Sequence, residues 1–393
     1  MRNRRLVVQS SVGLSAVLGV LAIIAIRPMW FRASAVPAPV MTSHPVLEGP
    51  VLGMGGRSLT RLATEPAVLV WASEVPASDR RALSRAMQAP IPSDGAALWM
   101  APKAARLLWE RRIPALQQVT VKTWVPKQGI PRAVVAAAAG AVHATTRGPW
   151  KLVQGTYQVP LGGTSVSVDL APRLSAQLSE VAGVHGAVVV LNRQGQWVGA
   201  GDTESSALWQ ARPVAMAALP PILAMALTDR PVASSMSRHA LSLSQMANLW
   251  GAAGFSRGLS QLGYHEGRMG FSPDANPALP KLSPSVFSEG AGLHATPLEL
   301  AQSYLPFLGS RARLSMHGAA PPAGRVPRGL AAALKEVLDQ MPSVAVDGLS
   351  YRIWRPAGDY AVVLAPRLGE VAVLEGTAVQ RTMSVIQIMG RNP

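Results

Sequence analysis

The chain has 393 residues, of which 49% are hydrophobic and 15% charged, with a mean hydropathy of +0.21 and a formal net charge of +16. This composition excludes a disordered chain, and the length leaves room for two or three domains, because single cores stop growing at roughly 250 to 300 residues. The positive charge favours anionic neighbours such as lipid headgroups. Nucleic acid is disfavoured, because the basic residues are scattered singly and no nucleic-acid-binding signature is present. The absence of cysteine excludes disulfides, zinc–thiolate sites and cysteine nucleophiles.

The N-terminus predicts a membrane anchor. Residues 1–5 contain three arginines, and residues 6–26 are uncharged and mostly apolar, which is about the length that a membrane-spanning helix needs. Positive charge before the apolar segment predicts a cytoplasmic N-terminus, with Trp30 and Phe31 at the far interface. We therefore expect residues 1–32 to be a cytoplasmic tip and transmembrane signal anchor, and the bulk of the chain to lie outside the cell membrane.

The alternative is a cleaved signal peptide that ends at the Ala-Ser-Ala sequence of residues 33–35. The anchor is favoured because the apolar segment is longer than the roughly 7 to 15 residues usual for a signal peptide. Residues 33–50 are rich in Pro, Ala, Ser and Val and predict an extended linker, so folding is expected to start near Leu52.

Two blocks of secondary structure follow. Residues 51–157 mix short apolar runs with amphipathic stretches and predict a small mixed domain, and residues 158–393 predict a second domain. The second block starts with a strand at residues 166–170 and an amphipathic helix, followed by a hairpin whose strands are residues 186–191 and 196–200.

Residues 214–227 are apolar nearly all round and predict a buried helix, which Pro220 and Pro221 must either kink or start. Further helices are expected at residues 243–251, 296–308 and 329–340, and closing strands at residues 350–354, 360–364 and 370–374. Because the hairpin, the helices and the closing strands come in separate groups, the pattern predicts an α+β fold rather than alternating βαβ units.

Five fragments of the chain, residues 48–59, 124–140, 167–170, 186–198 and 288–304 in that order, together resemble class B penicillin-binding proteins. Residues 288–304 (SEGAGLHATPLELAQSY) are similar to the family's glycine-rich turn and TPLQLAxAY helix, and residues 186–198 (GAVVVLNRQGQWV) resemble the hairpin before its active-site serine. Residues 167–170 (SVDL) resemble the family's TID strand, and residues 48–59 and 124–140 resemble two segments of its N-terminal pedestal. The resemblance implies an antiparallel transpeptidase-like sheet flanked by helices in residues 158–393, on a pedestal, or dimerisation-like, domain in residues 51–157.

The same resemblance implies that the catalytic residues are missing. The family's SxxK motif places a serine nucleophile one helical turn before a lysine, so that the amine takes the hydroxyl proton. Here the serine position holds Ala217 and the lysine position holds Pro220. The SxN motif falls near Ser242 and Ser244, with serine where the amide belongs. The KTG strand falls between residues 347 and 354, where GLSYR supplies no such triad.

The chain is therefore expected to be a pseudoenzyme, acting as a scaffold or regulator in bacterial peptidoglycan synthesis, division or sporulation. Its expected partners are cell-wall synthesis or division proteins, or peptidoglycan or another anionic wall polymer bound through the arginines. No cofactor is predicted, and the histidines show no metal-ligand spacing.

Two enzymatic alternatives remain. One is a D,D-transpeptidase with displaced catalytic residues. The other is a serine hydrolase using Ser256, because residues 254–258 (GFSRG) match the GxSxG nucleophile elbow. The elbow is disfavoured because the residues before it predict a helix rather than a buried strand.

Overall fold

A computed structural model describes most of the chain after residue 39. The described residues are 40–42, 46–87, 90–93, 95–100, 103–113, 116–132, 134–135, 145–146, 148, 150–158, 165–183, 185–202, 208, 211–236, 241–264, 283, 285–286, 292–310, 329–356 and 358–392. The predicted anchor in residues 1–32 lies outside this set. Among the described residues, no helix has both the length and the apolar character needed to cross a bilayer.

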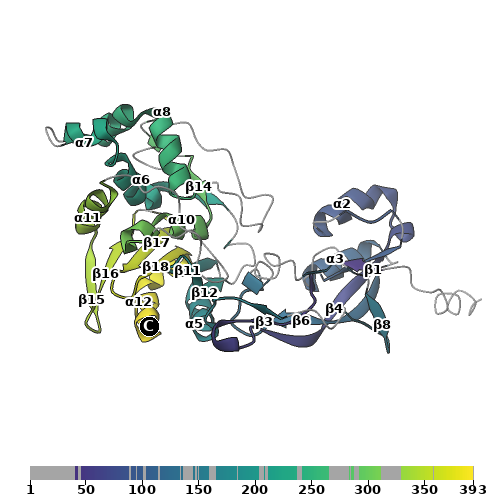
Figure 1. The fold of residues 1–393 in the computed structure, drawn as a ribbon. Helices are drawn as coiled ribbons and strands as arrows, with labels where there is room; N and C mark the ends of the chain where they lie inside the picture. Colours follow the sequence, from purple (N-terminus) through teal and green to yellow (C-terminus); the bar gives the residue numbers. More distant parts are fainter. Residues whose placement is uncertain are drawn as a thin grey trace, which may run out of the picture. The chain divides into compact units, whose positions relative to one another are not determined.

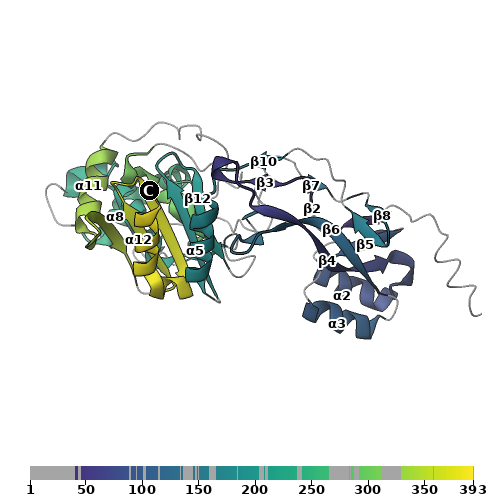
Figure 2. The ribbon, with the colours of Figure 1, turned by 90° about the horizontal axis from the view of Figure 1, so that it is seen from below.

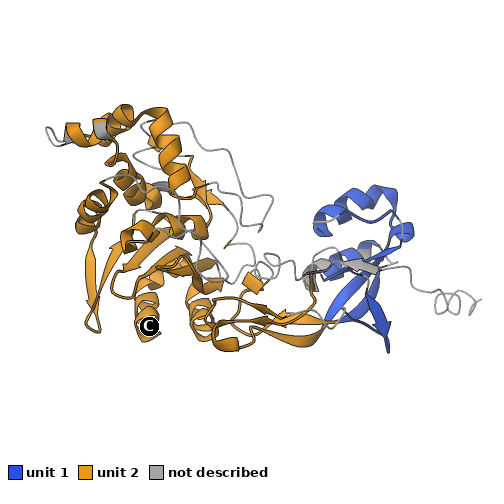
Figure 3. Cartoon of the chain, viewed as in Figure 1, with its two compact units in different colours: residues 1–44, 65–121, 147–158 blue, residues 45–64, 122–146, 159–393 orange. Residues whose placement is uncertain are grey.

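The chain divides into two compact units (Figure 3). Unit 1 comprises residues 1–44, 65–121 and 147–158, and unit 2 comprises residues 45–64, 122–146 and 159–393. Strands β4 (Thr60–Trp71) and β6 (Gln117–Pro126) each contribute residues to both units. The boundaries at residues 51 and 157 that the sequence suggests stay predictions.

Unit 2 is built on a six-stranded antiparallel sheet (Figure 1) with the strand order β12-β11-β18-β17-β16-β15. The strands are β11 (Gly186–Asn192), β12 (Trp197–Asp202), β15 (Ser343–Val346), β16 (Leu349–Trp354), β17 (Tyr360–Ala365) and β18 (Glu370–Gly376). The central strands β11, β17 and β18 are buried along almost their whole length, as their valine-rich sequences require.

Helices cover both faces of this sheet. Helices α5 (Pro172–Ala182) and α12 (Thr382–Arg391) pack on one face (Figure 2), where Leu178 and Ile386 join a core with Val188 and Val190. The other face carries a larger core to which the remaining helices contribute. These helices are η3 (Ala215–Ala218), α6 (Leu219–Ala226), α7 (Arg230–Met236), α8 (Leu243–Gln261), α10 (Pro297–Ser303), η4 (Leu305–Leu308) and α11 (Leu330–Gln340), and η5 (Thr377–Arg381) precedes α12.

Local sequence signals explain several of these elements. In the β11–β12 hairpin, the Asn192 carboxamide oxygen accepts hydrogen bonds from the backbone N–H groups of Gln194 and Gln196, each at 3.0 Å. Gly195 follows at φ 75°, a conformation that glycine adopts without strain. Helix α10 starts with a capping box, because Thr296 and Glu299 each accept the other's backbone N–H.

Unit 1 contains a mixed sheet in the order β1-β5-β4-β6-β9-β8. Besides β4 and β6 its strands are β1 (Val40–Thr42), β5 (Ala96–Trp99), β8 (Lys151–Val153) and β9 (Thr156–Gln158), with η2 (Ala72–Glu74) after β4. Helices α2 (Ala77–Met87) and α3 (Lys103–Arg112) pack against it through a third core, to which Leu83, Trp109 and Ile113 belong.

Short elements complete the fold. Strands β3 (Val51–Leu52) and β10 (Val166–Ser167) pair in parallel, and β13 (Arg212–Pro213) pairs antiparallel with β14 (His294–Ala295). Strand β2 (Val46–Leu47) pairs with β7 (Thr145–Thr146), and η1 (Met54–Gly56) follows β3. Together the sheets and helices form an α+β fold, as the sequence predicts.

The structure departs from the sequence-based expectation in three places. Residues 33–50 are expected to be a linker, yet β1 and β2 pair in sheets, because the extended backbone of Pro- and Val-rich segments is also that of a strand. The strand expected at residues 166–170 is only two residues long. The chain does not close on strands, because the C-terminal segment forms α12.

Candidate functional site

The two positions that the resemblance assigns to the SxxK motif lie three residues apart, on either side of the η3–α6 junction. Ala217 is in η3 and is completely buried, and Pro220 is the second residue of α6 and is also buried. Pro220 and Pro221 mark the start of α6 rather than a kink within it, since proline is tolerated in the first turn of a helix. Neither Ala217 nor Pro220 carries a group that could act as nucleophile or base.

The two prolines deprive the carbonyl oxygen of Ala217 of the main-chain donors that a helix would supply. In a helix this oxygen would accept from the N–H of the residue three or four positions ahead, and both of these residues are prolines, which have no N–H. The Tyr304 hydroxyl, at the end of α10, donates to the Ala217 oxygen at 2.6 Å instead. An aromatic side chain 87 residues away thus satisfies the buried carbonyl.

The neighbouring carbonyl of Met216 is held in a similar way. It accepts from the Leu219 N–H within the turn and from the indole Nε1 of Trp354 at 2.8 Å. Trp354 is the last residue of β16, so its side chain ties the sheet to the residue directly before Ala217.

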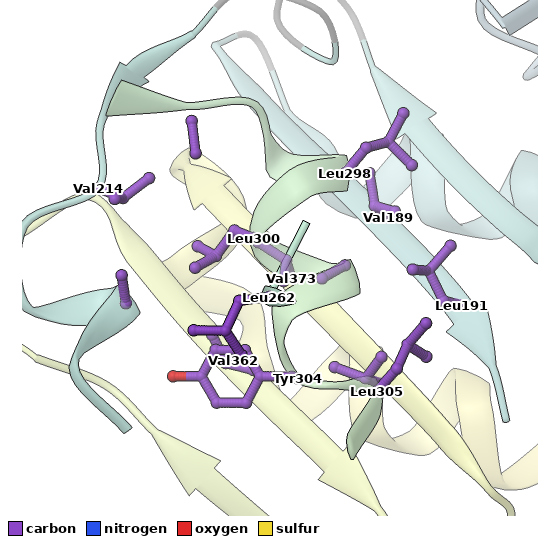
Figure 4. Packing of buried hydrophobic residues seen from close by; sticks show 14 of the residues in the cluster. Val189, Leu191, Val214, Leu262, Leu298, Leu300, Tyr304, Leu305, Val362 and Val373 are labelled. Atoms are coloured by element: carbon purple, nitrogen blue, oxygen red, sulfur yellow. The ribbon is translucent and has the colours of Figure 1, made fainter. Parts of the chain in front are cut away.

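Tyr304 itself is fully buried and lies among the apolar residues Val214, Leu262, Leu300 and Val362 (Figure 4). Burial raises the pKa of the Tyr304 hydroxyl well above its usual value, because the phenolate would be desolvated. The hydroxyl therefore keeps its proton and serves as a permanent hydrogen-bond donor.

Strand β16, where the resemblance puts the KTG triad, is paired along both edges. It pairs with β17 on one side and with β15 on the other, in the register Ser343↔Arg352 and Val346↔Leu349. The cation of the segment, Arg352, donates to the carbonyl of Met341 at 3.0 Å and forms an ion pair with Asp339 at 3.6 Å. Strand β15 therefore occupies the outer edge of β16 from Leu349 to Arg352, where an extended peptide would otherwise pair.

The serines near the expected SxN position belong to the start of α8. The Ser242 hydroxyl accepts from the Gln245 N–H at 3.2 Å, and the Gln245 side chain accepts from the Ser242 N–H at 2.8 Å, which is a capping box. Ser244 is exposed in the first turn of the helix. The Ser242 hydroxyl is therefore used to start the helix.

The GxSxG sequence lies inside α8. A nucleophile elbow needs a strand before the serine, whereas Ser256 is an exposed residue of a helix that begins at Leu243 and is interrupted at Gly251, where φ is 70° and ψ is 167°. Its two glycines have a packing role. A Cβ on Gly254 or on Gly258 would lie 2.5 Å from a ring atom of Trp250, so the indole lies across both glycines.

A buried polar row was not anticipated from the sequence. Four directly opposite residues form a row across neighbouring strands, so their side chains share one face of the sheet. They are Asp202 of β12, Ala187 of β11, Glu375 of β18 and Tyr360 of β17. Arg212 in β13 forms an ion pair with Glu375 at 2.9 Å. Burial raises the pKa of Glu375 to about 7, although the guanidinium of Arg212 acts in the opposite direction. The signal in the sequence was the pair of glutamates that bounds the apolar run of β18.

Glu370, the other glutamate of this pair, lies on the opposite face. It is 9% exposed, and its Oε2 atom has no hydrogen-bond partner among the residues that the structure describes. Burial raises the pKa of Glu370 to about 7. In the described part of the chain, acidic and histidine side chains form no group of three that could hold a metal ion.

No protein-family profile matches the chain, and no curated protein is similar to it. What the region can do therefore has to be argued from its residues. At the η3–α6 junction the described side chains supply hydrogen bonds to main-chain carbonyls and apolar packing, which stabilise this region without providing a nucleophile at positions 217 and 220.

Proposed function

We propose that this chain is a membrane-anchored pseudoenzyme with a penicillin-binding-like transpeptidase domain, which acts as a scaffold or regulator in bacterial peptidoglycan synthesis, division or sporulation. In this proposal residues 1–32 anchor the chain, residues 51–157 form the pedestal, and residues 158–393 form the transpeptidase-like domain outside the membrane. Its partners are cell-wall synthesis or division proteins.

The architecture of unit 2 supports the proposal. The family resemblance implies an antiparallel sheet flanked by helices, and the sheet β12-β11-β18-β17-β16-β15 has helices on both faces. Two of the five fragments that carry the resemblance are the β11–β12 hairpin and the capped start of α10. Tyr304 directly follows α10, and its hydrogen bond to Ala217 connects this fragment to the expected nucleophile position.

The residues at the η3–α6 junction are the observation that supports a loss of catalysis. A transpeptidase needs a hydroxyl and an amine here, held where a substrate carbonyl can reach them. Instead the junction has a buried alanine, two prolines, and two carbonyl oxygens that accept hydrogen bonds from Tyr304 and Trp354. A scaffold needs only the fold and its surface, and both remain without the catalytic groups.

The proposal is tested with two covalent probes. The purified full chain is incubated with a fluorescent penicillin and, separately, with a fluorophosphonate, followed by a denaturing gel and peptide mapping. We expect no label from either probe, and a Ser256→Ala variant should behave in the same way.

Each contrary result identifies one alternative. A penicillin adduct on any serine would mean that the chain is a D,D-transpeptidase with displaced residues. A fluorophosphonate adduct that maps to Ser256 and is lost in Ser256→Ala would make it a serine hydrolase. If neither probe labels the chain, pull-downs with wall-synthesis proteins and with peptidoglycan, at low and at raised salt, separate a protein scaffold from an arginine-dependent polymer binder.

A further inference from the structure

The helices of unit 1 expose arginines on the side turned away from their sheet. In α2, Leu83 and Met87 are fully buried, while Arg81 and Arg85 are exposed. Residues two apart in a helix point about 200° apart. Because Arg81 and Arg85 stand two positions before and after Leu83, both lie on the outer face of α2.

Helix α3 exposes two leucines in the same way. Trp109 and Ile113 are buried against the sheet, at 7% and 1% exposure, whereas Leu107 is 46% and Leu108 is 66% exposed. Leu108 has the highest exposure of the large hydrophobic residues that the structure describes. Single exposed leucines are ordinary, but Leu107 and Leu108 are adjacent, and Arg112 lies one helical turn after Leu108, which is the composition of an amphipathic surface.

An ion pair links the two helices, which contribute to the same core. The Arg112 Nε of α3 donates to the Asp79 carboxylate of α2 at 2.7 Å, and the same guanidinium lies 5.2 Å from the centre of the Trp109 ring. This ion pair neutralises the acid of α2. The sequences of the helices supply three basic residues against one acidic residue in α2, and four against one in α3.

We propose that the outer face of α2 and α3 rests on an anionic lipid bilayer, with Leu107 and Leu108 among the upper acyl-chain segments and Arg81 and Arg85 at the headgroups. Charge complementarity and the exposed leucine pair argue for lipid, because interfacial helices combine an apolar insert with basic residues. A protein partner is disfavoured, because the centre of a protein–protein interface is depleted of charged residues, whereas this face exposes Arg81 and Arg85.

The connection of unit 1 to the N-terminus agrees with this placement. Strand β1 begins at Val40 and pairs within the sheet of unit 1. Residues 27–39 therefore separate this sheet from the apolar residues 6–26, and an extended chain of that length spans at most about 45 Å. This second argument rests on the proposed anchor, whereas the amphipathic face does not.

The experiment uses the absence of native cysteine. Leu107→Cys and, as a matched control, Met383→Cys on α12 are made singly in the full chain, because both side chains are 46% exposed. Each is labelled with an environment-sensitive fluorophore and reconstituted in vesicles of pure phosphatidylcholine or with about one third phosphatidylglycerol. Quenching by a spin label on the lipid chains is compared with quenching by aqueous iodide.

We expect the label at position 107 to be quenched by lipid several-fold more than the label at position 383 in anionic vesicles, and this difference to shrink in phosphatidylcholine. Adding either the Arg81→Glu and Arg85→Glu pair or Leu108→Ser should lower the apparent affinity for anionic lipid about tenfold, as measured from the lipid quenching at position 107. The circular dichroism spectrum should stay unchanged.

Three results would overturn the inference. Equal lipid quenching at both positions would mean that α3 makes no specific contact. Protection of position 107 from iodide without lipid quenching would indicate a protein or a second copy. If adding a soluble anionic polymer abolished both the lipid quenching and the binding to lipid, the face would be assigned to that polymer. Resistance of the chain to extraction by alkaline carbonate reports on the anchor separately, so failure of the face and failure of the anchor are distinguishable.

Discussion

The carbonyl oxygen of Ala217 depends on one hydroxyl. Because Pro220 and Pro221 cannot donate, replacing Tyr304 with phenylalanine leaves a buried acceptor unsatisfied, and we expect the free energy of unfolding to fall by about 1–3 kcal/mol. Denaturant titration followed by fluorescence measures this change. Tyr264→Phe is the matched control, since its hydroxyl donates to Ser303, whose own proton already goes to the Leu300 carbonyl, and a smaller loss is expected.

A double-mutant cycle separates the hydrogen bond from general packing. Pro221→Ala restores a main-chain N–H four residues after Ala217. If the orphaned carbonyl is the cause, Tyr304→Phe should cost less in the Pro221→Ala background than in the native chain. Equal costs in both backgrounds would show that the tyrosine acts only through its ring.

Glu370 makes stability depend on pH. Its carboxyl has a pKa of about 7 when folded, against about 4.5 when unfolded, so the folded chain binds a proton that the unfolded chain releases between these values. The free energy of unfolding should therefore fall as pH rises from about 4.5 to about 7, by roughly 3 kcal/mol from this residue. Glu370→Gln should flatten the profile and raise stability at pH 8.

The profile is measured by denaturant titration across pH 4.5 to 8. A residual slope is expected from Glu375, which titrates in the same window and with the same sign. Glu336→Gln, an exposed glutamate on α11, controls for removal of one negative charge. An unchanged slope in Glu370→Gln would show that the carboxyl is better solvated than its burial implies.

At the scale of elements, α8 packs through its glycines. A Cβ at position 258 would lie 2.5 Å from the Trp250 ring, so Gly258→Ala should reduce stability by about 1–2 kcal/mol despite its better helix propensity. In a Trp250→Phe background the smaller ring removes the clash, and the same change should become neutral or stabilising. Thermal unfolding of the four proteins measures this, and a loss in both backgrounds would contradict the packing role.

The sequence predicted the elements that carry strong local signals. A valine run and an Asn-to-Gly turn predict the β11–β12 hairpin, and an amphipathic pattern predicts α5. The helix expected at residues 329–340 and the strands expected at residues 350–374 coincide with α11 and β16 to β18. Strand β15 has four half-buried or exposed residues and no such pattern. Helix α12 was missed because it begins after Arg381 without a capping side chain and contains β-branched residues.

The candidate site was less accessible to sequence reasoning. The residues at positions 217 and 220 could be read directly from the sequence, whereas the donors that satisfy the nearby carbonyls could not. Tyr304 and Trp354 lie 87 and 138 residues from their acceptors, and only the tertiary fold brings them together. The raised pKa values of Glu370 and Glu375 likewise arise from burial by distant elements.

At the scale of the whole molecule, each unit has its own apolar core. Leu83 is fully buried in the core of unit 1, and Leu83→Ala should cost about 2–5 kcal/mol there. Hydrogen exchange should then accelerate in β5 and α2, while β11 and α5 keep their protection. Leu178→Ala, fully buried in unit 2, is the matched control and should give the reverse pattern. Equal acceleration in both units after either change would mean that they unfold together.

The prolines of α6 also constrain which substitutions could place a lysine at position 220. Lysine there would bring a backbone N–H to the Met216 carbonyl, which already accepts from Leu219 and Trp354, and would place an amine where the ring of Pro220 is buried. A Pro220→Lys change alone is therefore expected to be destabilising, and less so in a chain in which Trp354 has already been replaced. Whether a lysine at position 220 can be reached through single tolerated substitutions thus depends on the order in which positions 354 and 220 change.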